Sequence, residues 1–138
     1  MRAATEPGVA TIPMMGSLED IARMVVDSGD VPLYVRFSAG PEADERATSR
    51  DEESGCQLPG LIVSPLMPEP WWNRSIECWV AHQLSQYLDF DSPIEHRIPW
   101  ILTGQPAGRG PRCELLVADV RPVALIDPTL VIKSLARI

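Results

Sequence analysis

Apolar residues recur at helical spacing in two separate parts of the chain. In the first part they follow the i, i+3, i+4, i+7 rule between Leu18 and Val25. Ser17 precedes them as a residue type that caps helix N-termini, and Gly29 follows as a stop signal. The pattern therefore predicts a short amphipathic helix from Ser17 to Ser28.

The second part, from about Asn73 to Leu88, shows the same period more strongly. One face of the predicted helix carries six apolar residues: Ile76, Trp79, Val80, Leu84, Tyr87 and Leu88. The prolines between Pro65 and Pro70 prevent regular structure immediately before it. This is the clearest helix in the sequence.

Shorter runs that are rich in β-branched and aromatic residues predict strands. These runs are "PLYVRFS" (32–38), "QLPGLIVSPL" (57–66), "IPWILTG" (98–104), "CELLVADV" (113–120) and "RPVALI" (121–126). The last segment, "PTLVIKSLARI" (128–138), fits either a strand or a terminal helix, and both alternatives stay open.

The order of these elements is helix, two strands, helix and then three strands. Because helices and strands do not alternate strictly, the order favours an α+β fold with a mainly antiparallel sheet and two principal helices. The length and the even composition indicate a single domain over residues 1–138. We expect residues 1–16 to be a loosely ordered lead-in and residues 39–55 to be a long exposed loop, because both segments lack periodicity.

The charge and hydropathy of the chain limit the classes of partner and the cellular locations that we expect for it. The formal net charge is −7, which argues against nucleic acid, because phosphate backbones bind clustered cations. No apolar run approaches the ~20 residues that cross a bilayer, and the first residues lack the apolar core of a secretory signal. We therefore expect a cytoplasmic protein without membrane contact, in an oligomeric state that the sequence does not fix.

The cysteines and histidines do not form a metal or disulfide pattern. Cys56, Cys78 and Cys113 are odd in number and widely spaced, unlike a disulfide framework or a zinc site. His82 and His96 have too few potential ligands near them in the sequence. We expect reduced thiols and no metal site, with Cys78 packed on its helix.

The stretch "QPAGRGPRCELL" (105–116) holds glycines that suggest a phosphate site. Its spacing lacks the GxGxxG of a dinucleotide fingerprint and the lysine of a P-loop. A hairpin connection whose glycines accept positive φ is the better interpretation. That connection would deliver Glu114 to the start of a strand, with Arg109 and Arg112 beside it.

Two adjacent tryptophans, Trp71 and Trp72, occur in the stretch "PEPWWNR". Adjacent tryptophans after a proline turn cannot both point the same way. We expect one to seal the core and the other to line a pocket or stack on a planar ligand. Packing of both is the alternative. Trp71, Trp72 and Arg109 are the candidate ligand-binding residues.

The segments "LYVRFSAGPEAD", "LPGLIVSPL", "PEPWW", "WVAHQL" and "PWILTGQPAGRGP" lie between about Leu33 and Ile126. Together they resemble an uncharacterised actinobacterial family of single-domain proteins of about this length. The resemblance implies a bacterial, cytoplasmic protein and supplies no activity. Where that family is expected to carry an acidic residue and an amide after "GRGP", this chain has Arg112 and Cys113.

Three polar residues stand in or at the ends of predicted strands: Arg36 in "YVRFS", Ser64 in "GLIVSPL" and Glu114 in "RCELLV". With the helix at 75–88, this order resembles the organisation of ADP-ribosyltransferase-like domains. The resemblance implies a nucleotide cofactor, for which NAD is one candidate, and a role for Arg36 in holding its phosphate or ribose. In the same family Ser64 would position the cofactor, and Glu114 would stabilise an oxocarbenium-like transition state.

Three classes of function remain open. The first is an NAD-using or other ribosyl-handling enzyme with Arg36, Ser64 and Glu114 as catalytic residues. The second is a non-catalytic acidic binding or immunity-type protein, whose loop 39–55 would meet a basic protein partner. The third is a small-molecule-binding accessory protein with a pocket walled by tryptophan.

Overall fold

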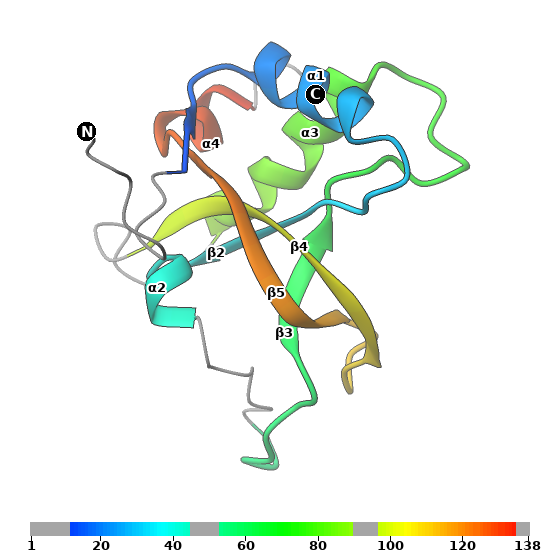
Figure 1. Cartoon of the computed structure of the whole chain (residues 1–138), viewed down its shortest axis with the longest axis vertical. Helices are drawn as coiled ribbons and strands as arrows, with labels where there is room; N and C mark the ends of the chain where they lie inside the picture. Colours follow the sequence, from blue (N-terminus) through cyan, green and yellow to red (C-terminus); the bar gives the residue numbers. More distant parts are fainter. Residues whose placement is uncertain (1–11, 45–52, 90–96, 135–138) are drawn as a thin grey trace, which may run out of the picture.

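The computed structural model describes residues 12–44, 53–89 and 97–134, and Figure 1 shows their arrangement. The elements in chain order are β1 (Met14–Met15), α1 (Leu18–Ser28), β2 (Tyr34–Ser38), α2 (Pro41–Asp44), β3 (Leu61–Pro65), α3 (Ile76–Ser85), η1 (Gln86–Asp89), β4 (Ile98–Arg109), β5 (Leu115–Ile126) and α4 (Thr129–Lys133). The prediction of an α+β fold with a mainly antiparallel sheet is confirmed, and α1 and α3 are its two principal helices.

The strands form one five-stranded sheet that closes on itself. Its order is β1-β5-β3-β2-β4, and β4 also pairs with β5. On β5, Val117 pairs with Leu61 of β3 on one side and with Pro106 of β4 on the other. Strands β2 to β5 are therefore antiparallel neighbours around a small barrel, and β1 adds a parallel pairing at the edge.

Alternate residues of the strands supply two apolar clusters on opposite faces of the sheet. Val35 and Ile101 belong to the larger cluster, formed with helices α1, α3 and α4, which gather at one end of the sheet (Figure 1). Their neighbours Tyr34 and Trp100 belong to the inner cluster, which the barrel encloses. The buried members of the inner cluster are Tyr34, Leu61, Val63, Trp100, Leu102 and Val117.

Helix α1 begins and ends where the sequence predicts. The hydroxyl oxygen of Ser17 accepts a hydrogen bond from the backbone N–H of Asp20 at 3.1 Å. Gly29 ends the helix with a φ of 60°, which favours glycine. The buried residues of the helix are Leu18, Ile21 and Val25.

Helix α3 is shorter than its prediction at both ends. Ser75 caps the helix by accepting a hydrogen bond from the backbone N–H of Cys78 at 3.1 Å, so the helix begins at Ile76 and not near Asn73. The α-helical part ends at Ser85, and the chain continues as the 3-10 helix η1. Much of the predicted apolar face is correct, because the buried residues include Trp79, Val80, Leu84 and Tyr87.

The largest correction concerns the C-terminal strands. The two strands predicted at 113–120 and 121–126 are one strand, β5, and β4 continues through the predicted connection as far as Arg109. Register shifts between β4 and β5 accommodate the glycines and prolines of this region, and Asp119 takes a φ of 51° at one of them. The pairing of β4 with β5 along a long hairpin therefore outweighs the turn propensity of the glycines and prolines in this region.

The segments predicted to be irregular contain short elements. Strand β1 pairs with Leu125 and Ile126 of β5, inside the predicted lead-in. Helix α2 lies inside the predicted exposed loop, and its Asp44 is only 8% exposed. Within the segment at 128–138, Thr129–Lys133 form helix α4, so the helical alternative holds for the described part. The rest of these three predictions, on residues 1–11, 45–52 and 135–138, lies outside the described residues.

Candidate functional site

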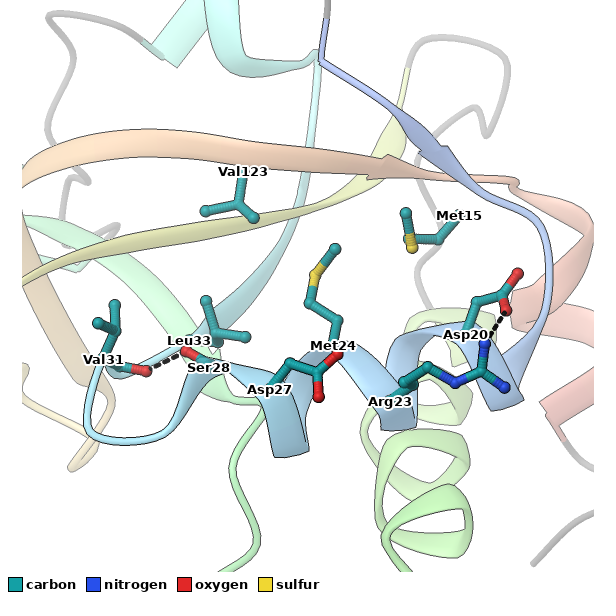
Figure 2. A pocket seen from close by; sticks show the side chains of 9 residues that line it. All are labelled: Met15, Asp20, Arg23, Met24, Asp27, Ser28, Val31, Leu33 and Val123. Carbon is teal, nitrogen blue, oxygen red and sulfur yellow. Dashed lines mark hydrogen bonds and ion pairs between the residues drawn. The ribbon is translucent and has the colours of Figure 1, made fainter.

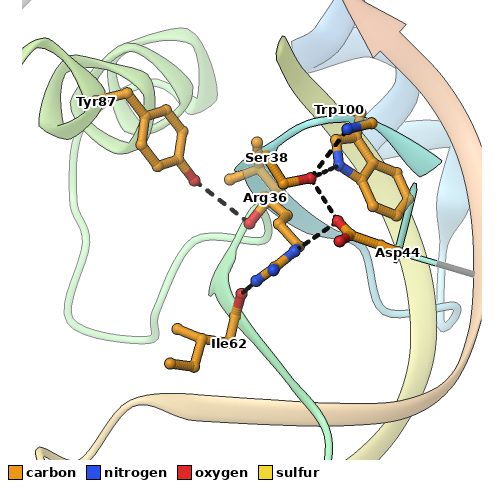
Figure 3. A network of polar contacts seen from close by, with 8 residues as sticks. Arg36, Ser38, Asp44, Ile62, Tyr87 and Trp100 are labelled. Atoms are coloured by element: carbon orange, nitrogen blue, oxygen red, sulfur yellow. Dashed lines mark hydrogen bonds and ion pairs between the residues drawn. The ribbon is translucent and has the colours of Figure 1, made fainter. Parts of the chain in front are cut away.

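Arg36 lies on β2, and two of its guanidinium nitrogens are engaged (Figure 3). Its Nε donates to Oδ2 of Asp44 at 2.8 Å, and its Nη1 donates to the backbone oxygen of Ile62 at 2.8 Å. The side chains of Arg36 and Asp44 are only 19% and 10% exposed. The arginine is therefore paired inside the fold, between the short helix α2 and strand β3.

Ser38 and Trp100 extend this pairing into a network, which we call the Arg36 cluster: Arg36, Ser38, Asp44 and Trp100 (Figure 3). The hydroxyl of Ser38 donates to Oδ2 of Asp44 and accepts a hydrogen bond from Nε1 of Trp100 at 3.0 Å. The same hydroxyl accepts from the backbone N–H of Gly40 at 3.2 Å. The cluster thus ties α2 to the barrel through mutually satisfied polar groups.

Ser64 of β3 pairs with Val35 of β2, so its side chain lies on the face that the helices cover, opposite to the side chain of Arg36. The hydroxyl oxygen of Ser64 accepts a hydrogen bond from Nε2 of Gln86 at 3.0 Å. The Tyr87 hydroxyl donates to the backbone oxygen of Val35 at 3.4 Å. Burial raises the pKa of Tyr87, and a hydrogen bond with Ser64 and the charge of Arg36 act in the opposite direction. Tyr87 is therefore a neutral phenol at neutral pH.

Glu114 and Arg109 hold the turn of the β4–β5 hairpin. The carboxylate Oε1 of Glu114 accepts a hydrogen bond from the backbone N–H of Arg112 at 2.6 Å, and its backbone oxygen accepts from Gly110 at 2.8 Å. Arg109 donates from Nη1 to the backbone oxygen of Cys113 at 3.1 Å. Cys113 has a φ of 65°, so the turn is tight and these contacts stabilise it.

The structure does not bring the three predicted catalytic side chains together on one face of the sheet. Ser64 pairs with Val35 on the face that the helices cover, whereas Arg36, the next residue on β2, pairs with Trp100 on the inner face. Arg36 and Glu114 make no hydrogen bond or ion pair with each other within the described residues. Leu115, which follows Glu114, pairs with Val63, so Glu114 comes near the end of the same strand that carries Ser64. The catalytic assignment of the trio stays a prediction.

The two predicted ligand-binding tryptophans lie in the segment between β3 and α3. In Figure 1 this segment forms a loop that extends away from the sheet. Trp71 is 70% exposed, and Trp72 is half-buried. Neither residue is fully buried, so the expectation that one of them seals the core is wrong. Trp79, which is 2% exposed, takes that place. The role of the pair in ligand binding stays a prediction.

An open groove runs along α1, and no pattern in the sequence predicts it (Figure 2). Its volume is about 660 Å³, and its lining residues come from β1, α1, the turn after α1 and β5: Met15, Asp20, Arg23, Met24, Asp27, Ser28, Val31, Leu33 and Val123. None of the predicted site residues lines it. Its parts are far apart in the sequence, so no local motif could have indicated it.

The groove combines an apolar floor with a charged rim of two aspartates, Asp20 and Asp27, and one arginine, Arg23. Met24 points from α1 toward Val123 of β5, and Met15 lies beside them (Figure 2). Asp20 and Asp27 lie on the helix side, and Asp20 is 4.0 Å from Arg23 in an exposed ion pair. Flexible methionine side chains adapt to varied apolar partners. The groove can therefore receive an apolar surface that carries positive charge.

Neither a metal site nor a membrane-spanning helix is found in the part of the chain that the structure describes. No group of three potential metal ligands occurs among those residues, and no helix there is long and apolar enough to cross a bilayer. His82 is exposed and lies 6.0 Å from the Trp72 ring, measured between ring centroids, and His96 lies outside the described residues. All three cysteines are free.

The fold and these sites define a small α+β protein with a closed sheet, an internally paired polar cluster and an open apolar groove. The chain belongs to the DUF6098 family, a family of unknown function whose model matches residues 8–138. No curated protein and no solved structure matches the chain. Membership of an uncharacterised family is thus confirmed. None of the comparisons supports an actinobacterial source or links the chain to ADP-ribosyltransferases.

Proposed function

We propose that the protein is a non-catalytic binding protein whose groove along α1 receives a cationic, amphipathic segment of a partner protein. The observation that carries this proposal is the groove itself, with a volume of about 660 Å³ and a floor of Met15, Met24, Leu33 and Val123. An amphipathic helix that lays its apolar side into such a groove is a common mode of peptide recognition.

Charge selects the kind of segment that fits. Asp20 and Asp27 line the groove beside Arg23, which pairs with Asp20, so Asp27 is the carboxylate left for a partner's cation, and the chain as a whole carries a net charge of −7 with a single lysine, Lys133. A partner with lysine or arginine beside its apolar face would be attracted before contact and held at the rim. The same field would repel acidic partners.

Exposed apolar side chains on the same elements support a docking face. Met14 of β1, Val26 of α1 and Val31 after α1 are 53%, 62% and 52% exposed. Single exposed apolar residues are ordinary on protein surfaces, but here they occur on the elements that form the groove. A partner that covers them would gain from their burial.

The test uses two synthetic helical peptides with the same leucine face, one with lysines and one with glutamates on the polar face. Binding is followed by isothermal titration calorimetry and by backbone amide chemical shifts. We expect the lysine peptide to bind, to shift amides of β1, α1 and residues 31–33, and to weaken as salt is added. The glutamate peptide should not bind.

The matched variants exchange one acidic residue for lysine inside and outside the groove. Asp27→Lys should weaken binding of the lysine peptide by about tenfold or more, as expected for the loss of a rim charge and its reversal. Glu42→Lys, which makes the same charge change at an exposed residue of α2, should leave the affinity within about twofold. Equal weakening by both variants, or shifts elsewhere on the surface, would refute the proposal.

ADP-ribosyl handling by Arg36, Ser64 and Glu114 is the second candidate, and the observation in its favour is that the strand segments that carry Arg36 and Ser64 are adjacent, although the two side chains lie on opposite faces of the sheet. It ranks second because Arg36 would have to exchange Asp44 for a cofactor phosphate. A thermal-shift assay with NAD tests it: a bound ligand at a hundredfold over its Kd stabilises a protein by about 2.7 kcal/mol. Absence of any shift would reject this candidate.

A further inference from the structure

Trp71 is exposed and yet held in place. Its side chain is 70% exposed, while its ring centroid lies 6.0 Å from that of Trp72 and 5.8 Å from that of Trp79, both in edge geometry. The backbone N–H of Trp72 donates to the backbone oxygen of Glu69 at 2.9 Å and closes a turn that contains Trp71. A large aromatic ring that is already ordered loses little freedom when a ligand binds it.

The indole N–H groups of the three tryptophans differ in one respect. Trp79 donates from Nε1 to the backbone oxygen of Pro65 at 3.2 Å, and Trp72 donates from Nε1 to the backbone oxygen of Ser75 at 2.9 Å. Trp71 makes no such hydrogen bond within the described residues. Its indole therefore offers an open ring and a donor to a backbone carbonyl from outside.

We propose that Trp71 is the centre of a binding site for a proline-rich peptide in the polyproline II conformation, separate from the α1 groove. Such a peptide is extended, has no internal hydrogen bonds and presents its carbonyl oxygens to solvent. Aromatic side chains recognise it by packing on the proline rings, and binding costs little entropy because the conformation is preformed. Inside the molecule, the indole N–H of Trp79 already donates a hydrogen bond to the backbone oxygen of a proline, Pro65.

The charges around Trp71 favour this uncharged ligand over two others. Arg74 lies 5.9 Å from the Trp72 ring centroid, so a cationic ligand that sought the aromatic cluster would meet a positive charge beside it. A nucleic-acid base could stack on an indole, but its phosphates would be repelled by a net charge of −7. A neutral peptide backbone meets neither obstacle.

The experiment titrates the full chain with a ten-residue polyproline peptide and, separately, with a glycine-serine peptide of equal length. Tryptophan fluorescence and the indole N–H signals in a proton–nitrogen correlation spectrum report binding. We expect saturable binding of the polyproline peptide only, with the largest shift on one exposed indole signal, which is lost in Trp71→Ala.

Three variants separate the contributions. Trp71→Ala should weaken binding by about tenfold or more, because a rigid aromatic anchor is removed. Trp71→Phe keeps a ring but lacks the N–H, so its affinity should fall between those of the parent protein and Trp71→Ala. Ile132→Ala, at another exposed apolar residue with 66% exposure, should bind like the parent protein.

Two results would overturn the proposal. The first is the absence of saturable binding by the polyproline peptide, or binding that Trp71→Ala leaves unchanged. The second is preferential binding of a neutral oligosaccharide such as maltohexaose, which also stacks on exposed indole rings. Both results are independent of the groove, because Asp27→Lys should not affect binding at Trp71.

Discussion

Arg36 and Arg23 each face a carboxylate, but the two pairs lie in different surroundings. The pair of Arg36 with Asp44 spans 2.8 Å and its side chains are 19% and 10% exposed, whereas the pair of Arg23 with Asp20 spans 4.0 Å at 72% and 55% exposure. In the first pair, Arg36 also donates to the backbone oxygen of Ile62, and Asp44 also accepts from the hydroxyl of Ser38, on the inner side of the sheet. The second pair is open to solvent at the rim of the groove.

The difference separates side chains that hold the fold from side chains that remain available. A carboxylate that is buried with an arginine and a hydroxyl cannot be removed without leaving polar groups unsatisfied. An exposed pair is screened by water and can exchange its partner at little cost. Binding is therefore expected where the pairs are weak, and stability is expected to depend on the Arg36 cluster.

The largest expected effect is that of Asp44→Ala. The substitution leaves the guanidinium of Arg36 without its carboxylate in a mostly buried position, and we expect a loss of about 2–4 kcal/mol in the free energy of unfolding. Asp20→Ala removes the carboxylate of the exposed pair and should cost less than about 1 kcal/mol. Urea denaturation of both variants measures the contrast, and equal losses would contradict it.

The next effect concerns two glycines, Gly60, which precedes β3, and Gly16, which lies between β1 and α1. A methyl group at Gly60 would meet the backbone oxygen of Val117 at 2.4 Å, so Gly60→Ala must push β3 away from β5. We expect it to cost about 1–3 kcal/mol, as overpacking does. Nothing lies within 4 Å of the same position at Gly16, beside α1, and Gly16→Ala should stay within about 1 kcal/mol. Similar unfolding midpoints in urea for the two variants would argue against a closed barrel.

The smallest effect is a pH-dependent one at the start of α4. A hydrogen bond from the backbone N–H of Thr129 and another from its hydroxyl hold the pKa of Asp127 below the ordinary value of 3.8, and Lys133 acts in the same direction. Because the folded pKa is lowered, this stabilisation is present above the unfolded pKa and is lost as the pH falls through the folded pKa. Asp127→Ala should lower the Tm at pH 7, and the difference from the parent protein should shrink in strongly acidic buffer.

A Tm difference for Asp127→Ala that stays constant from neutral to strongly acidic pH would contradict this account. The loss would then arise from something other than the charge of the carboxylate. Thermal melts followed by circular dichroism over a series of buffers provide the measurement.

Helix α1 could be predicted from the sequence because its signals are local. The cap at Ser17, the apolar spacing and the stop at Gly29 all lie within thirteen residues, and each has a direct structural cause. Strands β2 and β3 were predictable for the same reason. The class of fold follows from the order of such elements.

The continuation of β4 and the position of α2 could not be predicted in this way. Gly104, Pro106 and Gly108 suggest a loop, and only pairing with the whole of β5 makes that segment a strand. Asp44 looks like one of many acidic residues in a polar stretch, and its burial depends on Arg36, Ser38 and the closed sheet. Both features depend on tertiary contacts that carry no local pattern.

The candidate sites also differ in whether local sequence predicts them. The neighbouring positions of Arg36 and Ser64 follow from pairing of two predicted strands. The groove along α1 does not, because Met15, Met24 and Val123 meet only after β1 has joined β5 at the end of the chain. The exposure of Trp71 likewise depends on how the ring of Trp79 packs against it.

The β4–β5 hairpin has a further consequence for the order of assembly during folding. Its two strands meet across the short turn between Arg109 and Leu115, so their pairing needs little loop closure, whereas Tyr34 reaches Leu102 only from a distant part of the chain. We expect the hairpin to form early and the Arg36 cluster, which needs β2, α2 and β4 together, to form late. In stopped-flow experiments Asp44→Ala should therefore speed unfolding and leave the folding rate nearly unchanged.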